Sequence, residues 1–409
     1  VLFRSVSPPA ASDGGIDINS LMASFEQVTP VPTPTFSDQL HALQDDDPST
    51  FGTYDGTGTV GGGTCMGGYV RELDLYLDCT KMLGFLAIVN SEESNLDKLA
   101  KLLQIQEMDN MAGPGGNGLY ISNNTNLINT AGLASLNLVA GGLTIEENPK
   151  LTSTGGIGNN LNSVGVNSDG ESIVITNNPA LVDVGEWDIW KGEVSGGLTV
   201  EDNLVLAHLN GMSGLKSVGG GVTIRFNPVL SDISGLQNLN SVGKDALGNS
   251  VVVVENANLR DLSGLRGLQG MLEGAVHVAN NKGLTSLEGL QQVLGIGKDA
   301  NGVSLNITNN ALLESLEALE GLNGKLDGSV TVMLNPSLRV LAGLQAISEI
   351  GADEKGNSLS VIANSLLNSM LGFSGLKSVD GAIAVTDNEG LPSLGGLGVS
   401  SILGKNADG

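Results

Sequence analysis

Four short segments rich in Asp, Asn and Gly contain most of the acidic side chains whose spacing could support chemistry. These segments are GVNSDGES (165–172), GKDALGNS (243–250), GKDANGVS (297–304) and GADEKGNS (351–358). Their acidic residues include Asp245, Asp299, Asp353 and Glu354. A Ca²⁺ site needs six or more oxygen ligands, usually from a denser acidic run. We therefore expect turns with polar decoration and no cofactor, with weak Ca²⁺ binding as the alternative.

The chain has two cysteines, Cys65 and Cys79, close together in the sequence. A pair at this spacing could form one disulfide, which would place the protein in an oxidising compartment. Two N-glycosylation sequons, at Asn123 and Asn306, fit the same compartment. Such sequons also arise by chance, so they add only modest support.

The other reactive residue types form no recognisable catalytic or metal-binding motif. His41, His208 and His277 have no Cys or acid at the spacing of metal ligands, and we expect the last two to point outward from strands. Trp187 and Trp190 are the only tryptophans; we expect local packing, with stacking on a sugar or a partner as the alternative. No nucleophile elbow, P-loop, dinucleotide fingerprint or HExxH motif is present. The sequence therefore predicts a protein without catalytic residues, not an enzyme.

One repeated segment, apolar-x-apolar-x-x-Asn-x-x-Leu, recurs between about residues 119 and 391 and positions the Asp/Gly segments and most of the other groups. Its copies lie 24 to 30 residues apart, with one strand pattern in each. A period of this size indicates a solenoid, in which each unit buries its apolar side against its neighbours. The sequence therefore predicts an all-β fold, a right-handed parallel β-helix of about 12–13 coils.

A single Asn marks the same place in every repeat. An Asn at a strand-to-turn corner can satisfy turn backbone groups and tolerates a left-handed conformation. Amides stacked in register can also bond to one another. We expect a structural ladder, with a ligand site as the alternative. The members are Asn124, Asn148, Asn178, Asn203, Asn227, Asn256, Asn281, Asn310, Asn335, Asn364 and Asn388.

Composition excludes several classes of partner. The net charge is -25, from 44 acidic and 19 basic residues. Binding to nucleic acid or to an anionic membrane surface requires clustered Lys and Arg, so neither is expected. No run of 18 apolar residues is present, so this segment should not insert into a membrane.

The chain divides into three parts. Residues 1–60 are rich in Pro, Ser and Thr, which predicts an extended arm. Residues 61–117 should form an N-terminal cap that contains the disulfide. Residues 118–409 should form the solenoid. The last residues, LGKNADG, match the first half of the Asp/Gly segments, so we expect the sequence to end inside a further coil.

The cap is also expected to contain a helix from Ser91 to about Met108. Ser94 and Asp97 resemble a capping box at its start. Four leucines should share one face of it. They are Leu96, Leu99, Leu102 and Leu103.

Two segments, LTSLEGLQQVLGIG (284–297) and LKSVGGGVTIRFNPVL (215–230), resemble the receptor L-domain repeats of growth-factor-receptor ectodomains and fungal cell-wall proteins. Cys79 followed by LGFLAI is similar to the entry of that family. The resemblance covers about residues 65–409 and implies a leucine-rich β-helix, secreted or displayed at the cell surface, without enzymatic activity. Two features depart from the family: receptor L domains have about half as many coils, and they close with further cysteines, whereas none follows Cys79 here.

Two functions follow as hypotheses. The first is an extracellular structural subunit, in which head-to-tail solenoid contacts and docking of the arm build a filament or a cell-surface assembly. The alternative is a cell-surface recognition module that binds glycan or protein on one solenoid face. The expected partners are accordingly further copies of the chain, or else glycans and other surface proteins.

Overall fold

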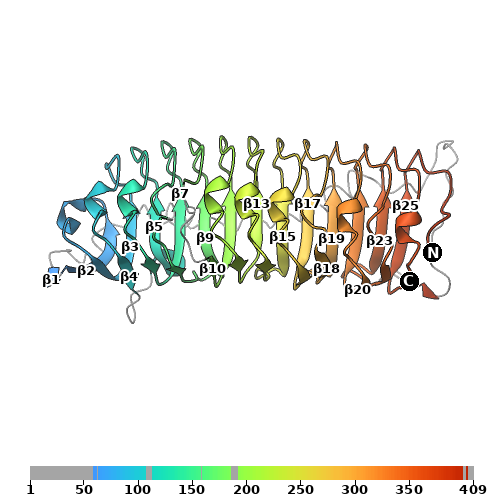
Figure 1. Cartoon of the computed structure of the whole chain (residues 1–409), viewed down its shortest axis with the longest axis horizontal. Helices are drawn as coiled ribbons and strands as arrows, with labels where there is room; N and C mark the ends of the chain where they lie inside the picture. The colour runs from blue at the N-terminus through green and yellow to red at the C-terminus, as the bar shows by residue number, and fades with distance from the viewer. Residues whose placement is uncertain are drawn as a thin grey trace.

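The computed structural model describes residues 59–61, 63–106, 113–157, 159–185, 192–398 and 402–403. These residues form a parallel β-solenoid of about 12 turns, confirming the fold class predicted from the spacing of the repeats. The turns stack along the long axis of a straight rod (Figure 1). Most of the predicted arm, residues 1–58, lies outside the described residues.

One side of the rod is a continuous parallel sheet. Inward positions hold Leu, Val or Ile, and the register stacks them on one another, as in Leu198↔Val222 and Val200↔Ile224. All four side chains are fully buried. Each strand pairs with the equivalent strand of the next turn. The strands are β3 (Lys81–Val89), β5 (Asn117–Ser122), β7 (Gly142–Glu146), β9 (Glu171–Thr176), β11 (Gly197–Glu201), β13 (Val222–Arg225), β15 (Asn249–Val254), β17 (Ala275–Ala279), β19 (Val303–Thr308), β21 (Ser329–Met333), β23 (Asn357–Ile362) and β25 (Ala382–Thr386).

The second side is a sheet of shorter strands that is interrupted three times. Among the described residues, strand pairing is absent between β8 and β10, between β14 and β16, and between β18 and β20. At the third break a single hydrogen bond remains, from the N of Asn323 to the carbonyl of Leu294 at 3.2 Å. After each break, the sheet resumes at a glycine with positive φ. These glycines are Gly192, Gly270 and Gly324, with φ of 96°, 77° and 74°. The strands are β4 (Gln104–Gln106), β6 (Leu138–Val139), β8 (Ser163–Val164), β10 (Glu193–Val194), β12 (Ser217–Val218), β14 (Ser241–Val242), β16 (Gly270–Leu272), β18 (Val293–Ile296), β20 (Gly324–Leu326), β22 (Ile347–Ile350), β24 (Ser378–Val379) and β26 (Ile402–Leu403).

Short 3₁₀ turns occur on the third side of the rod. Apolar residues recur every third position here, as in Ile233, Leu236 and Leu239, and all three are buried. Residues three apart in a 3₁₀ turn lie on the same face, so this spacing directs all of them inward. The turns are η2 (Leu73–Tyr76), η3 (Asp97–Leu99), η5 (Ala131–Leu133), η6 (Asn210–Met212), η7 (Ser234–Leu236), η8 (Ser263–Leu265), η9 (Glu317–Leu319) and η10 (Leu371–Phe373). A further 3₁₀ turn, η4 (Pro114–Gly116), lies in the connection between β4 and β5.

The N-terminal end contains the predicted disulfide but not the predicted helix. Cys65 and Cys79 are bonded, with their Cα atoms 5.8 Å apart. The hairpin of β1 (Thr59–Gly61) and β2 (Thr64–Val70) covers the first turn, because β2 pairs with β3. The helix expected from Ser91 to about Met108 is wrong: in its described part the chain forms only η3 and β4.

The leucine spacing explains this error. Leu96, Leu99 and Leu102 repeat every third residue and are fully buried, like the leucines of the other 3₁₀ corners, whereas Leu103 is 40% exposed. The expected capping box is also absent, because the backbone N–H of Asp97 bonds to the side chain of Asn95, at 3.0 Å. The three-residue spacing of these leucines is therefore that of a solenoid corner and not of a helix.

Candidate functional site

The Asn ladder is buried and satisfied by the protein itself. The eleven side chains are at most 2% exposed. Asn124 shows the pattern: its Nδ2 and its backbone N donate to Oδ1 of Asn148, at 3.0 and 3.1 Å. Nδ2 of Asn124 also donates to the carbonyl of Ile88, at 2.9 Å. With these groups occupied, the ladder presents no surface to a ligand.

The left-handed backbone conformation expected at the ladder Asn belongs instead to the residue before it. Twelve non-glycine residues have φ between 50° and 58°, and each immediately precedes a ladder position. In the first turn this residue is Asn90, and Ser91 occupies the ladder position, its N–H bonded to Oδ1 of Asn124 at 2.9 Å. The residue with positive φ lets the chain leave the strand. The side chain of the following Asn then forms hydrogen bonds with backbone groups of the turn.

The loop carboxylates that resembled Ca²⁺ ligands are occupied by their own turns. Oδ1 of Asp245 accepts the N–H groups of Leu247 and Asn249, at 2.9 and 2.7 Å. Oδ1 of Asp353 accepts those of Lys355 and Asn357, at 2.9 and 2.8 Å. Across the described part of the chain, no group of three His, Cys, Asp or Glu side chains is placed to hold a metal ion.

The structure separates the remaining predicted site residues. His277 is 5% exposed, not a surface residue as expected, because the 297–304 loop of the next turn covers this outward position. His208 is partly buried, while His41 and the segment holding Trp187 and Trp190 lie outside the described residues.

The two sequons also differ from one another. Asn123 is partly exposed, and its Nδ2 bonds to Oδ1 of Asn90 at 2.6 Å. Asn306 is 6% exposed within β19, next to the ring of His277. An attached glycan needs an amide that points to solvent, so Asn306 is not presented for this modification in the folded protein and Asn123 is the better candidate.

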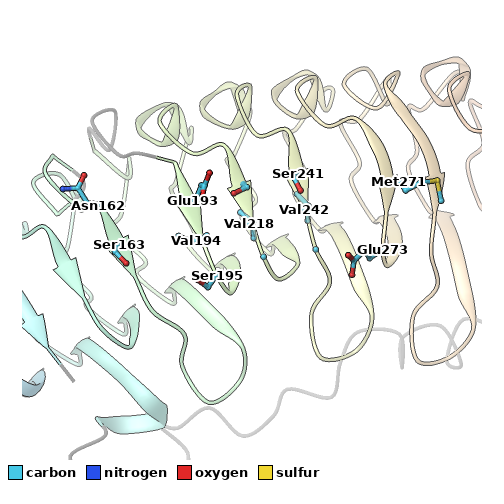
Figure 2. A pocket seen from close by; sticks show the side chains of 13 residues that line it. Asn162, Ser163, Glu193, Val194, Ser195, Val218, Ser241, Val242, Met271 and Glu273 are labelled. Carbon is cyan, nitrogen blue, oxygen red and sulfur yellow. The ribbon is translucent and has the colours of Figure 1, made fainter. Parts of the chain in front are cut away.

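The second sheet carries an open groove that sequence reasoning missed. Its volume is about 760 Å³, and it spans β8, β10, β12, β14 and β16. Figure 2 shows that its side chains come from successive turns rather than from one loop. The polar and exposed lining consists of Asn162, Ser163, Glu193, Ser195, Ser217, Ser241, Met271 and Glu273.

Three of these residues lie in register. Glu193 pairs with Ser217, and Ser217 pairs with Ser241, so their side chains repeat at the strand spacing of roughly 4.8 Å. The adjacent valines of these strands point inward and are buried. The repeated Ser-Val pairs at 163–164, 217–218 and 241–242 are the only sequence signal of this arrangement.

The chemistry of the groove is polar and acidic. Among the described residues, the lining contains hydroxyl groups, an amide, and the carboxylates of Glu193 and Glu273, and none of the lining residues is Lys, Arg, His or Cys. The two carboxylates disfavour an anionic ligand. The arrangement is therefore suited to a neutral or basic ligand that binds through hydrogen bonds. Met271, which is 66% exposed, adds an adaptable apolar contact at one end.

Comparison with known proteins places a family match on this part of the chain. The family model described as Receptor L domain matches residues 192–294, a range that includes β10, β12, β14 and β16 of the groove. The match and the solenoid are consistent with an L-domain-like repeat protein, and they suggest a receptor-like or recognition module. No curated protein matches the chain.

A search of solved structures adds nothing to this conclusion. A chain from "Crystal structure of TLR13-ssRNA13 complex" has 12% identity, covers 76% of this chain and 68% of its own length, and gives a TM-score of 0.14. That score is too low to support an argument about fold or ligand.

Receptor L domains are extracellular, and the Cys65–Cys79 disulfide fits that location. None of the helical segments in the described ranges has the length and apolar character needed to cross a bilayer.

Proposed function

We propose that this protein is an extracellular, non-enzymatic recognition module that binds its ligand in the groove on the second sheet. The observation that supports this proposal is the coincidence of the groove with the receptor L-domain match. Four of the five strands that line the groove lie within residues 192–294. The polar side chains come from β-strands of a packed solenoid, which hold them in fixed register as a binding site requires.

The groove also differs from the rest of the polar surface in being open, with no loop of the described residues filling it. The carboxylates of the Asp/Gly loops bond to their own backbone, whereas the row of Glu193, Ser217 and Ser241 faces an open volume. Polar groups that face such a volume can bond to a ligand without first breaking internal bonds.

Substitution in the groove, combined with a binding screen, tests this proposal. Ser241→Trp would fill the groove with a large ring, and Ser378→Trp, at the corresponding register position of β24, is a matched control outside it. The purified protein is screened against glycan and cell-surface protein arrays, and hits are measured by surface plasmon resonance. We expect Ser241→Trp to reduce binding at least tenfold and Ser378→Trp to leave it unchanged. Equal effects of the two substitutions would contradict the groove as the binding site.

A second candidate function is the structural subunit of a filament. The observation that favours it is the parallel stacking of equivalent strands along the rod, a contact that another copy stacked head to tail would continue. Cryo-electron microscopy of the full chain tests this candidate: fibres in which copies stack end to end would support it, and dispersed particles at high concentration would contradict it.

A further inference from the structure

The outward side chains of the two sheets differ sharply in their exposure to water. On the second sheet, Met271 and Leu294 lie outside the core and are 66% and 48% exposed. On the first sheet, Met333 and Ile362 also lie outside the core, yet they are only 1% and 5% exposed. Strand alternation directs Met333 outward, because its neighbour Val332 belongs to the core. Two methionines in equivalent orientations therefore have opposite surroundings.

The buried outward residues of the first sheet form one column along the rod, which we call the outer strip. The parallel register of β15, β17, β19, β21, β23 and β25 aligns its members across successive turns. Four of the six are at most 9% exposed, and none of the six is charged. The members are Val254, Ala279, Thr308, Met333, Ile362 and Thr386.

The described elements do not account for this burial. β21 makes its main contacts with β19 and β23, which flank it within the sheet and do not lie over it. The 297–304 loop meets the sheet at His277, where Oδ2 of Asp299 lies 3.2 Å from Nε2. That position is two residues before Ala279, the strip member on β17. Within the described ranges no helix or strand crosses the outer strip, so its low exposure requires another covering segment.

The longest part of the chain outside the described ranges is residues 1–58, and it joins the rod at this same sheet. β1 pairs with β2, and β2 pairs with β3. The strip residue on β21 lies ten strand spacings from β2, or roughly 48 Å. Residues 1–58 could span up to roughly 190 Å when extended. This segment is therefore long enough to reach the strip and to follow it to β25.

The composition of residues 1–58 suits such a contact. The range 29–37 is rich in Pro, which favours an extended conformation. Residues 1–58 contain eight acidic residues and one basic residue, so an uncharged strip accepts them better than the acidic second sheet does. The range 16–25 supplies apolar side chains that can pack on the strip. They are Ile16, Ile18, Leu21, Met22 and Phe25.

We propose that residues 1–58 lie back along their own chain as a strap that covers the outer strip of the first sheet. The strap removes outward apolar side chains such as Met333 and Ile362 from water, which stabilises both surfaces. A contiguous apolar strip left bare would favour association between copies. The strap therefore closes the first sheet to partners and leaves the second sheet, with its groove, as the accessible one.

Oxidation of methionine in the full, unmodified chain tests whether the strip is covered. Met333 and Met271 are a matched pair, because both point outward from a sheet of the same rod. The chain is treated with dilute hydrogen peroxide, and peptide mass spectrometry follows each methionine. Oxidation depends on access to the sulfur, so we expect Met333 to react at least about tenfold more slowly than Met271. Equal rates would show that the strip is open to solvent and would overturn the proposal.

Photochemical cross-linking of the full chain identifies the covering segment. Photoreactive methionine replaces methionine throughout, and the irradiated protein is digested and analysed by mass spectrometry. We expect cross-links from position 333 to residues 1–58, and none to these residues from position 271. Mixing isotopically labelled and unlabelled protein shows whether the joined peptides belong to one copy. Cross-links that join two copies, or no product between position 333 and residues 1–58, would contradict a strap formed by the chain itself.

Discussion

The Asn corner and the second-sheet groove both place polar residues at fixed positions of successive turns, yet they differ in what those residues contact. Each ladder Asn bonds to the backbone and to the next Asn, and is buried. The row of Glu193, Ser217 and Ser241 is equally regular and faces an open groove. A repeated polar residue is therefore structural when its neighbours satisfy it, and available for binding when they do not.

Removing one Asn from the middle of the ladder should have the largest effect on stability. Asn256→Ala leaves the backbone N of Asn227 without its acceptor, which lies at 3.3 Å, and removes the donor to the carbonyls of Ile224 and Val254. Nδ2 of Asn227 also loses one of its acceptors, at 3.3 Å. Several buried polar groups become unsatisfied, so we expect a loss of about 3 to 5 kcal/mol in the free energy of unfolding. Denaturant unfolding followed by circular dichroism measures it. A loss below about 1 kcal/mol would mean that the Asn ladder contributes no more to stability than the polar row of the groove.

The next largest effect should come from Glu171, an outward carboxyl on β9 that is only partly satisfied. Burial, with the nearby charges of Asp245 and Asp169, raises the pKa of Glu171 to about 7, although a hydrogen bond from Thr199 opposes this shift. The folded state therefore favours the protonated form, and stability is lost as the pH rises from the ordinary carboxyl range to about 7.

The variant Glu171→Gln removes this penalty. It should stabilise the protein by about 1 to 2 kcal/mol at pH 8, allowing for partial exposure to water, and change little at pH 4. Unfolding midpoints at the two pH values give the comparison. An equal gain at both would show that the titration of Glu171 is not responsible.

A smaller effect is expected at the left-handed position beside the ladder. Ala363 has φ of 56°, a conformation that Asn tolerates better than Ala. Ala363→Asn should therefore stabilise the protein by about 0.5 to 1 kcal/mol, and Ala363→Val should destabilise it, because branched residues fit this conformation poorly. Thermal unfolding of both variants measures the change in stability relative to the unmodified protein. A loss for Ala363→Asn or a gain for Ala363→Val would contradict the prediction.

The smallest effect on stability should occur in the groove. Ser217→Ala removes a hydroxyl that faces the open volume, so we expect a change within about 0.5 kcal/mol. A much larger loss in the same unfolding assay would mean that the groove row is structural, like the ladder.

The sequence was sufficient for the fold because the repeat is local and regular. The Asn spacing and the alternating apolar residues determine the turns, and the core follows from them. The helix prediction failed because Leu96, Leu99 and Leu102 fit both a helix face and a 3₁₀ corner. Only stacking on the next turn distinguishes the two, and that information is not local.

The groove was harder to predict because it also depends on contacts between residues that are far apart in the sequence. The Ser-Val pairs of the groove are short and chemically plain, and their alignment depends on the register between turns. His277 is likewise outward by strand alternation, and only the loop of the following turn buries it. The filament was our first functional hypothesis. The family match, which covers four of the five groove strands, instead favours the recognition alternative.

The interrupted second sheet has a mechanical consequence. The first sheet is hydrogen-bonded from β2 to β25 without a break, whereas the second sheet lacks strand pairing at three places. Bending that stretches the continuous wall must strain hydrogen bonds, while bending in the opposite sense can open the three unpaired junctions. The rod should therefore have unequal stiffness in the two directions, and it should flex at Gly192, Gly270 and Gly324 rather than uniformly along its length.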